Sequence, residues 1–529
     1  MKHFNVIFEP DDKRISIHAG ATLLEAAGQA GIILNSVCGG KGICKKCLVK
    51  LEPGAKQVLA CQHRIQKDLT VTIPAGSRFF EQKILEHGID THIGVRPTIH
   101  EKYRTKESTD EIFGLAVDIG TTTVVAKLIN MVDGQCLATQ AALNPQSCHG
   151  DDVVSRIAYA KTDKKLAELH KLIIDCINDL IAKLCKQTSI DAKQIYEMSV
   201  VGNTTMNHLF LKLPVERLGL APYKAFSLDA HDTPAARLNL NINPDGNVHT
   251  AENIAGFVGS DTTAVALATD IDSADQMSLA IDIGTNGEIV LGTKDKLYAA
   301  SCAAGPAFEG ARISCGSRAA EGAIEAVVVD NGDIVLDVIG TLPPRSICGS
   351  GLIDAVAVML DLGIIDASGR FTKPSTVIGR LSPAILSRIC EQDGQLTFSL
   401  ADSVVLTQKD IREVQLAKAA IRAGTKILQR RLSIEDADVQ QILLAGAFGN
   451  YIRPQSAMRI GLLPNVPLER IRFVGNAASS GAQMILLSRH CREKARELAR
   501  KIEYIEIANE LDFQTVFAES MSFDISIRY

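Results

Sequence analysis

The chain has 529 residues and a formal net charge of −5. This length exceeds one ordinary hydrophobic core and predicts about two to four domains. The small net charge, and the lack of a dense Lys/Arg run with interleaved aromatic residues, exclude a typical nucleic-acid-binding surface. The sequence also lacks a basic leader followed by an apolar stretch, and it has no membrane-length apolar run. We therefore expect a soluble, cytoplasmic protein that does not bind membranes.

The cysteines of the chain are unevenly distributed. An odd total of 13 in a large chain without an export signal favours reduced thiols and metal ligation over disulfides. Only the first 61 residues contain a group of them, and the remaining cysteines are scattered singly. The grouped cysteines are Cys38, Cys44, Cys47 and Cys61.

The amino-terminal residues predict a small domain of strands around one short helix. Apolar and polar residues alternate on both sides of the turn Glu9-Pro10-Asp11-Asp12, as expected for a half-buried hairpin. Thr22 and Glu25 have the spacing of a capping box, and apolar residues follow them at helical spacing. The expected strands are 2–8, 15–18, 48–51 and 69–73.

The cysteine spacing predicts an iron–sulfur site. The pattern C-x5-C-x2-C followed by a distant Cys is close to the plant-type ferredoxin pattern, with one extra residue in the first interval. Gly39, Gly40 and Gly42 would let the backbone curl around a cluster. A four-cysteine zinc site is the alternative, but such sites usually have two C-x2-C pairs and this segment has one. Residues 1–76 therefore resemble a β-grasp [2Fe-2S] ferredoxin of the adrenodoxin-like type, with all the grouped cysteines as ligands.

Residues 77–112 carry no sustained helical or strand pattern. We interpret them as a linker that would let the cluster domain move between an electron donor and an acceptor.

Beyond the linker the sequence repeats itself. Two copies of Asp-Ile-Gly-Thr each follow an apolar segment and precede another, which predicts strand, tight turn and returning strand. Such turns offer backbone N–H groups and hydroxyls to a phosphate, and their carboxylates can hold Mg²⁺ or its waters. One copy alone would be an ordinary turn, but two copies favour a pair of phosphate loops. The candidate residues are Asp118, Gly120, Thr121 and Thr122 in the first copy, and Asp282, Gly284, Thr285 and Asn286 in the second.

Two later segments complete this pattern. The buried strand expected at 439–444 leads into small residues that would let a flat ring approach the backbone, namely Gly446, Ala447 and Gly449. Residues 475–482 predict a helix with a small-residue face, suited to tight packing between domains. Simple strand–helix packing is the alternative for both segments.

These elements, in this order, resemble the acetate and sugar kinase, actin and chaperone ATPase superfamily over about residues 113–490. The resemblance implies a two-lobed ATPase at 113–529 that binds ATP and Mg²⁺ between its lobes, with an adenosine turn at Gly446 to Gly449. Asp118 and Asp282 are the candidate catalytic carboxylates, and which of them orders Mg²⁺ or the attacking water stays open. The expected fold class is a multidomain α/β and α+β protein, with a β-grasp ferredoxin domain joined to an actin-like ATPase.

The combination of a ferredoxin domain with this ATPase, together with the stretches VVGNTTMNHLFL, AAGPAFEGARISCGSRAAEGAI and ICGSGLIDA, resembles the reductive activators of corrinoid-dependent methyltransferases. The resemblance implies ATP-dependent transfer of one electron through the [2Fe-2S] cluster to cob(II)alamin in a corrinoid protein, which restores cob(I)alamin. It also implies a low-potential electron donor of the ferredoxin or flavodoxin type. Some relatives have a middle domain, for which we expect no room here.

Other interpretations remain open at this stage. The chain could donate electrons to another low-potential enzyme, phosphorylate a small molecule with a redox domain attached, or act as a nucleotide-gated binding module. The turn at Asn203 could be a helix cap or part of the nucleotide site. We expect His208 to serve packing or capping, and the thiols of Cys302, Cys315 and Cys348 to be structural. Glu309 and Glu321 have no assigned role.

Overall fold

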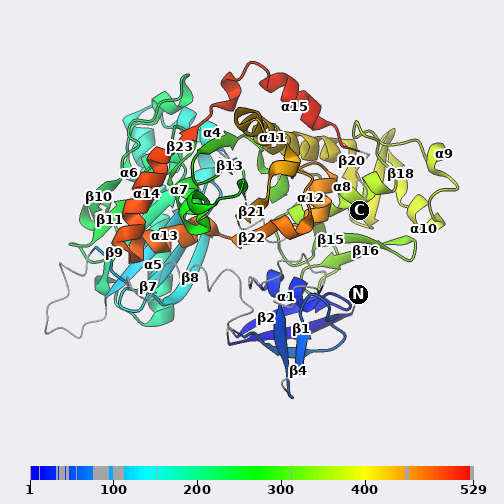
Figure 1. Cartoon of the computed structure of the whole chain (residues 1–529), viewed down its shortest axis with the longest axis horizontal. Coiled ribbons are helices and arrows are strands. Elements are labelled where there is room, and N and C mark those ends of the chain that lie inside the picture. The colour runs from blue at the N-terminus through cyan, green and yellow to red at the C-terminus, as the bar shows by residue number, and fades with distance from the viewer. Residues whose placement is uncertain are drawn as a thin grey trace.

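The computed structural model describes most of the chain (Figure 1). A small amino-terminal sheet domain lies beside two larger units, each built on its own sheet. Within the described part, no helix has the length and apolar character needed to cross a membrane. The described residues are 2–10, 12–30, 32, 34, 42, 47–54, 56–74, 95–98, 112–150, 152–310, 312–446 and 452–524.

The amino-terminal domain is a five-stranded sheet in the order β2-β1-β5-β3-β4, with β1 parallel to β5. The predicted capping box is present: the Thr22 N–H donates to Glu25 Oε2 at 2.7 Å, and the Glu25 N–H donates to Thr22 Oγ1 at 3.2 Å. The elements are β1 (His3–Glu9), β2 (Lys13–His18), α1 (Leu23–Gln29), β3 (Leu48–Glu52), β4 (Lys56–Leu59) and β5 (Leu69–Thr72). The predicted hairpin, helix and later strands are confirmed, and β4 was not predicted.

The first lobe contains a six-stranded sheet in the order β10-β11-β9-β6-β7-β8. Its strands are β6 (Phe113–Ile119), β7 (Thr123–Asn130), β8 (Cys136–Leu143), β9 (Ile195–Gly202), β10 (His231–Pro234) and β11 (Asn247–Thr250). Its helices are α4 (Val153–Tyr159), α5 (Asp163–Thr188), α6 (Thr204–Leu211) and α7 (Ser260–Thr269).

The second lobe repeats this arrangement in the order β22-β21-β12-β13-β14-β23. In each lobe an antiparallel meander of three strands comes first, and two later strands then add in parallel on the side of its first strand. The sixth strands differ, because β10 pairs antiparallel with β11 and β23 pairs with β14 at the opposite edge. The strands are β12 (Ser278–Ile283), β13 (Gly287–Gly292), β14 (Leu297–Cys302), β21 (Gln441–Ala445), β22 (Ile471–Gly475) and β23 (Ile502–Tyr504). The internal repeat of the sequence is therefore a duplication of the fold.

Two small sheets and several helices are inserted in the second lobe between β14 and β21. These elements are β15 (Ala323–Asp330), β16 (Asp333–Val338), β17 (Ser346–Ile347), α8 (Gly349–Asp361), α9 (Pro374–Val377), α10 (Pro383–Leu386), β18 (Ile389–Gln392), β19 (Gln395–Ala401), β20 (Val404–Thr407) and α11 (Gln408–Leu432). The later helices are α12 (Pro454–Arg459), α13 (Ala477–Leu487), α14 (Arg489–Lys501) and α15 (Phe513–Met521).

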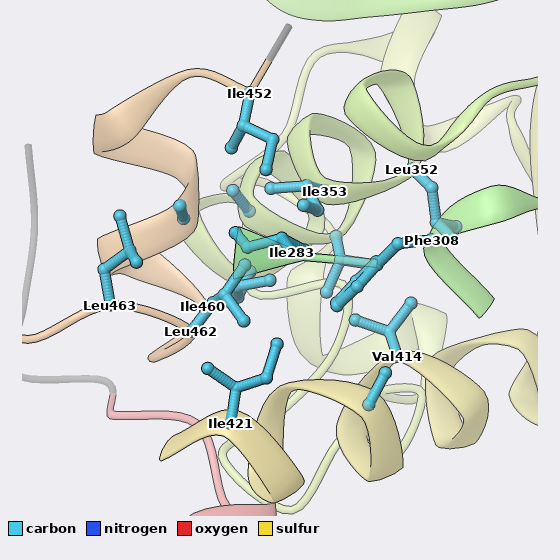
Figure 2. Packing of buried hydrophobic residues seen from close by; sticks show 14 of the residues in the cluster. Ile283, Phe308, Leu352, Ile353, Val414, Ile421, Ile452, Ile460, Leu462 and Leu463 are labelled. Atoms are coloured by element: carbon cyan, nitrogen blue, oxygen red, sulfur yellow. The ribbon is translucent and has the colours of Figure 1, made fainter. Parts of the chain in front are cut away.

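The hydrophobic core of the second lobe supports the second phosphate loop. Figure 2 shows Ile283, which ends β12, packed in one cluster with Phe308 and with side chains of α8 and α11. Ile283 and Phe308 are 2% and 3% exposed. The loop that follows β12 therefore starts from a fixed position.

Helices α7 and α13 join the two lobes at close range. A Cβ atom added to Gly481 of α13 would lie 2.2 Å from the backbone oxygen of Ala264 in α7, so only glycine permits this approach. Ala264 and Ala482 belong to one buried cluster that combines residues of both lobes. The small-residue helix predicted at the domain junction is confirmed.

The amino-terminal domain contacts the second lobe through Asp337 of β16. Nε2 of His3 lies 3.1 Å from Asp337 Oδ1, and Nε2 of His18 lies 3.5 Å from Oδ2. The Asp337 side chain is only 4% exposed. A buried carboxylate of the ATPase thus meets two histidines of the sheet domain (Figure 1).

Candidate functional site

The two predicted phosphate loops meet between the lobes. The first loop connects β6 to β7, and the second connects β12 to β13. Oγ1 of Thr122 in the first loop lies 2.9 Å from Oγ1 of Thr285 in the second. Residues far apart in the sequence therefore form one site.

The first loop is held by polar groups of its own lobe. The Gly120 N–H donates to the Thr123 carbonyl at 2.9 Å, and a Cβ atom on Gly120 would lie 2.7 Å from that oxygen. Asn203 Nδ2 donates to Thr121 Oγ1 at 3.0 Å. The guanidinium of the fully buried Arg156 donates to the Thr121 carbonyl at 2.6 Å. These contacts fix the direction in which the loop presents its amides and hydroxyls.

Asn203 caps a helix and also contacts the first phosphate loop. Its Oδ1 accepts a hydrogen bond from the Met206 N–H at 3.0 Å and caps α6. Its Nδ2 contacts the first phosphate loop, as described above. Arg156 was not predicted, because no sequence pattern distinguishes it from an exposed arginine of a short helix.

The second loop is connected to a carboxylate that had no assigned role. The Gly284 N–H donates to the Asn286 carbonyl at 3.1 Å, and the Gly305 N–H donates to the Thr285 carbonyl at 3.0 Å. The Thr285 hydroxyl donates to Oε1 of Glu309. Glu309 therefore belongs to the site.

Carboxylates gather behind the loops. Asp118 and Asp282 occupy equivalent positions near the ends of β6 and β12, and burial raises the pKa of each to about 7. The charge of Asp261, in the first turn of α7, contributes to both shifts, and burial raises its own pKa to about 6. A hydrogen bond from the Asn476 side chain opposes the shift at Asp118.

Glu288 of β13 adds a further acid, because it pairs in register with Asp282. Burial, followed by the charges of Asp261 and Asp282, raises the pKa of Glu288 well above its ordinary value. This concentration of acids favours the binding of a cation, which would stabilise their ionised forms. Asp261 and Asn476 were not predicted, although they begin the two helices that follow equivalent strands of the duplicated lobes.

The predicted adenosine turn begins next to the second phosphate loop. Gly446 has φ +89°, and a Cβ atom there would lie 2.5 Å from Asp282 Oδ1. Both the positive φ and the short distance to Asp282 require glycine at this position. Ala447 and Gly449 lie outside the described residues.

Two of the predicted cluster ligands are brought together in the amino-terminal domain. Cys47 and Cys61 are buried, 0% and 6% exposed, and the Ala60 N–H donates to the Cys47 carbonyl at 2.9 Å. The Gln62 amide donates to Cys61 Sγ at 3.7 Å, as expected for a donor that supports a thiolate. Cys38 and Cys44 lie outside the described residues. The two described thiols are buried and one has a nearby hydrogen-bond donor, which fits the chemistry of iron–sulfur ligands.

His208, Cys302 and Cys348 lie in the protein interior, as expected for structural residues. Nδ1 of His208 lies 2.7 Å from the Thr204 carbonyl, and its Nε2 accepts from the backbone N–H of Phe226 at 3.2 Å. Burial lowers the pKa of His208 to about 4, so the ring is neutral. Cys302 and Cys348 are buried in the second lobe.

Family models match the chain in three consecutive parts. Residues 7–66 match the 2Fe-2S iron-sulfur cluster binding domain, 113–274 the RACo middle region, and 276–526 the C-terminal domain of RACo, described as the ASKHA domain. The middle region coincides with the first lobe. The expectation that no extra domain lies between the linker and the two lobes is not contradicted by this match and stays a prediction.

Relatives match over 78% to 98% of the chain. The corrinoid activation enzyme RamQ of Eubacterium limosum is 35% identical over 98% of this chain and 99% of its own length. A [Co(II) methylated amine-specific corrinoid protein] reductase of Methanosarcina barkeri is 24% identical over 78% of this chain and 77% of its own. The solved structure of a reductive activator for corrinoid, iron-sulfur protein is 32% identical, covers 98% of both chains and has a TM-score of 0.72. The chain belongs to the family of ATP-dependent reductive activators of corrinoid proteins, with an iron–sulfur domain in front of an ASKHA ATPase.

Proposed function

We propose that the protein transfers one electron from an amino-terminal [2Fe-2S] cluster to the cobalt of a partner corrinoid protein, reducing cob(II)alamin to cob(I)alamin. ATP bound between the lobes would drive the transfer. The observation that carries the proposal is the meeting of Thr122 and Thr285 between duplicated lobes, in a chain that also has a ferredoxin domain. The proposed division is 1–76 for the cluster domain, 77–112 for the linker and 113–529 for the ATPase.

The cluster would be held by Cys38, Cys44, Cys47 and Cys61. Burial of Cys47 and Cys61 removes water from their thiols, and nearby donors such as the Gln62 amide support negative charge on sulfur. A cluster with these ligands supplies a one-electron carrier at low potential.

The phosphates of ATP would lie between the two loops. The hydroxyls of Thr121, Thr122 and Thr285 would donate to the phosphates, and Gly120, Gly284 and Asn286 would shape the two loops around them. Gly446, Ala447 and Gly449 would contact the adenosine.

We assign Mg²⁺ to the acids behind the loops. Among the described residues, no three His, Cys, Asp or Glu side chains form a group that could hold a metal ion. Mg²⁺, however, is commonly held by one or two carboxylates together with phosphates and waters. The raised pKa values of Asp118 and Asp282 support a cation between them and the nucleotide, because a cation would remove the cost of ionising them.

The need for ATP follows from the potentials. A plant-type cluster lies near about −400 mV, and moving one electron a further ~100–200 mV uphill costs about 2–5 kcal/mol. Closure of the lobes on ATP could supply this energy if the closed form binds the oxidised corrinoid protein in a state that is easier to reduce. The electron donor would be a low-potential ferredoxin or flavodoxin, and we place the reaction in the cytoplasm.

The test mixes reduced protein with a cobalt(II) corrinoid protein and follows the cobalt(I) absorption band with and without ATP. We expect the band only with ATP in the wild type, and no band for Cys47→Ser. Cys176→Ser is the matched control, because Cys176 is a buried thiol of α5 in the first lobe. A cobalt(I) band that forms equally without ATP, or with Cys47→Ser, would refute the proposal.

A further inference from the structure

The segment that follows β14 runs along the second phosphate loop. Gly287 pairs in register with Cys302, so β14 ends at the edge of the sheet where the loop between β12 and β13 lies. The Gly305 N–H donates to the Thr285 carbonyl at 3.0 Å, and the Thr285 hydroxyl donates to Oε1 of Glu309. The segment therefore holds a carboxylate beside the phosphate loop.

The order of the strands sets the end of the nucleotide that Glu309 faces. β12 lies between β21, which leads into Gly446, and the β13–β14 hairpin, which leads into Glu309. The candidate adenosine turn and Glu309 thus lie on opposite sides of the second phosphate loop. With the adenosine against Gly446, a triphosphate that crosses this loop has its terminal phosphate on the side of Glu309. Thr122 of the first lobe reaches the same place, since its Oγ1 lies 2.9 Å from Oγ1 of Thr285.

The duplicated fold provides an internal comparison. In the first lobe the segment after β8 makes the same backbone contact, because the Asn144 N–H donates to the Thr122 carbonyl at 2.8 Å. A proline and a short turn follow in both lobes, Pro145–His149 in the first and Pro306–Glu309 in the second. Counted from each proline, the place of the glutamate is taken by Cys148 in the first lobe. The fold therefore does not need an acid at this place, and its presence in the second lobe indicates a chemical role.

Glu309 is held by the core of the second lobe, and its charge is not neutralised. Phe308, which precedes it, packs with Ile283 in one buried cluster (Figure 2). Gly310, which follows it, has φ +81°, and a Cβ atom there would lie 2.3 Å from the Ser317 carbonyl oxygen. In the described part of the chain, Glu309 forms no ion pair with a Lys, Arg or His side chain. The carboxylate is thus fixed in place and available as a proton acceptor.

The contact with Thr285 links Glu309 to the phosphates of bound ATP. The Thr285 hydroxyl has only one proton to donate. When it donates to a phosphate, as proposed above, Oε1 of Glu309 loses this donor. A water molecule between the carboxylate and the terminal phosphate can replace it, because an ionised carboxylate only accepts hydrogen bonds. A carboxylate within hydrogen-bond reach of the attacking water is what general-base catalysis requires.

We propose that Glu309 is the general base of ATP hydrolysis. This inference rests on ATP binding between the loops, as proposed above. The Glu309 carboxylate takes one proton from the water molecule, and the water oxygen forms a bond to the phosphorus of the terminal phosphate. The bond from this phosphorus to the oxygen that bridges to the β-phosphate breaks, which yields ADP and inorganic phosphate. Glu309 then returns its proton to the solvent, and the acids behind the loops are left to Mg²⁺.

Glu309→Gln tests this role, because it removes the base and keeps a side chain of the same size with an oxygen that can accept from Thr285. General bases contribute about 100-fold or more to a rate, so ATP hydrolysis should slow by at least this factor. The Kd for ATP with Mg²⁺ should equal that of the wild type, since no contact with the nucleotide is lost. Hydrolysis is measured as release of inorganic phosphate in single turnovers, and binding by calorimetry.

Glu321→Gln is the matched control, because Glu321 lies in the same glycine-rich stretch and contacts Thr341. This variant should hydrolyse ATP at the wild-type rate. Unchanged binding of ATP by Glu309→Gln also shows that this variant is folded, so a slower reaction then reports on the chemical step.

Two results would overturn the inference. The first is hydrolysis by Glu309→Gln at close to the wild-type rate. The second is a loss of ATP affinity that appears only with Mg²⁺, which would make Glu309 a ligand of the cation instead. A wild type that binds ATP without hydrolysing it would refute this inference alone, whereas a wild type that does not bind ATP would refute the proposed function itself.

Discussion

The contact between α7 and α13 makes Gly481→Ala a sharp test of how the lobes are joined. The added Cβ atom would lie 2.2 Å from the Ala264 oxygen and 2.6 Å from its carbonyl carbon and Cα. All three are backbone atoms of a helix, so no side chain can turn away. Ordinary contact begins near 3.4 Å, and the helices must therefore separate by about 1 Å.

The expected cost combines two opposing effects. Overpacking of a buried contact destabilises a protein by about 1–3 kcal/mol. Replacing glycine by alanine inside a helix stabilises the helix by up to about 1 kcal/mol, because alanine has the higher helix propensity. We therefore expect a net loss of about 1–2 kcal/mol in the free energy of unfolding. The separation should also displace Asn476, the N-cap of α13 that bonds to Asp118, and so weaken ATP binding.

Urea denaturation measures the first effect and calorimetry the second. Gln483→Ala, a half-buried position on the same helix, is the control and should change stability by less than about 0.5 kcal/mol. If Gly481→Ala is as stable as the control and binds ATP with unchanged affinity, the close approach of the helices does not set the position of the lobes.

Three further predictions concern charged residues. Burial lowers the pKa of Lys418 from 10.5 to about 7, so between these pH values the unfolded chain binds one proton more than the folded chain. The free energy of unfolding should therefore rise with pH in this window. Lys418→Met should make this rise smaller, as measured by urea denaturation at about pH 7 and about pH 9.5. Asp337→Asn should weaken the contact with His3 and His18 and so release the cluster domain from the second lobe. X-ray scattering should then give a larger radius of gyration than for the wild type, and an unchanged radius would contradict this prediction. Mg²⁺ should increase the affinity of the wild type for ATP, and Asp118→Asn should reduce this increase at least about tenfold in calorimetry. Equal affinity of the wild type with and without Mg²⁺ would refute the assignment of Mg²⁺ to these acids.

The sequence was most informative where chemistry demands a pattern. The Asp-Ile-Gly-Thr copies predicted the first two strands of each meander, because each tight turn needs a glycine next to the carboxylate and hydroxyls. The match of residues 7–66 to an iron–sulfur domain agrees with the cysteine spacing. The small-residue face near Gly481 likewise predicted close packing of helices. β4 escaped notice because it has only four residues, none of them buried.

Residues that act through tertiary contacts were not predictable in this way. Arg156, Asp261 and Glu309 lie in separate segments, and only the folded lobes bring them to the phosphate loops. Their own sequence surroundings resemble ordinary helix starts and turns. The first lobe was expected from the repeat, but its equivalence to the family's middle region required the family comparison.

A single-turnover experiment tests the central claim that ATP drives an electron from the amino-terminal cluster to cobalt. The reduced protein and a cobalt(II) corrinoid protein are mixed with ATP in a stopped-flow spectrometer, and cluster oxidation and cobalt(I) formation are followed together. The account predicts that both signals change at the same rate and in equal amounts, and only when ATP is present. Cobalt(I) formation without cluster oxidation, or at the same rate without ATP, would contradict it.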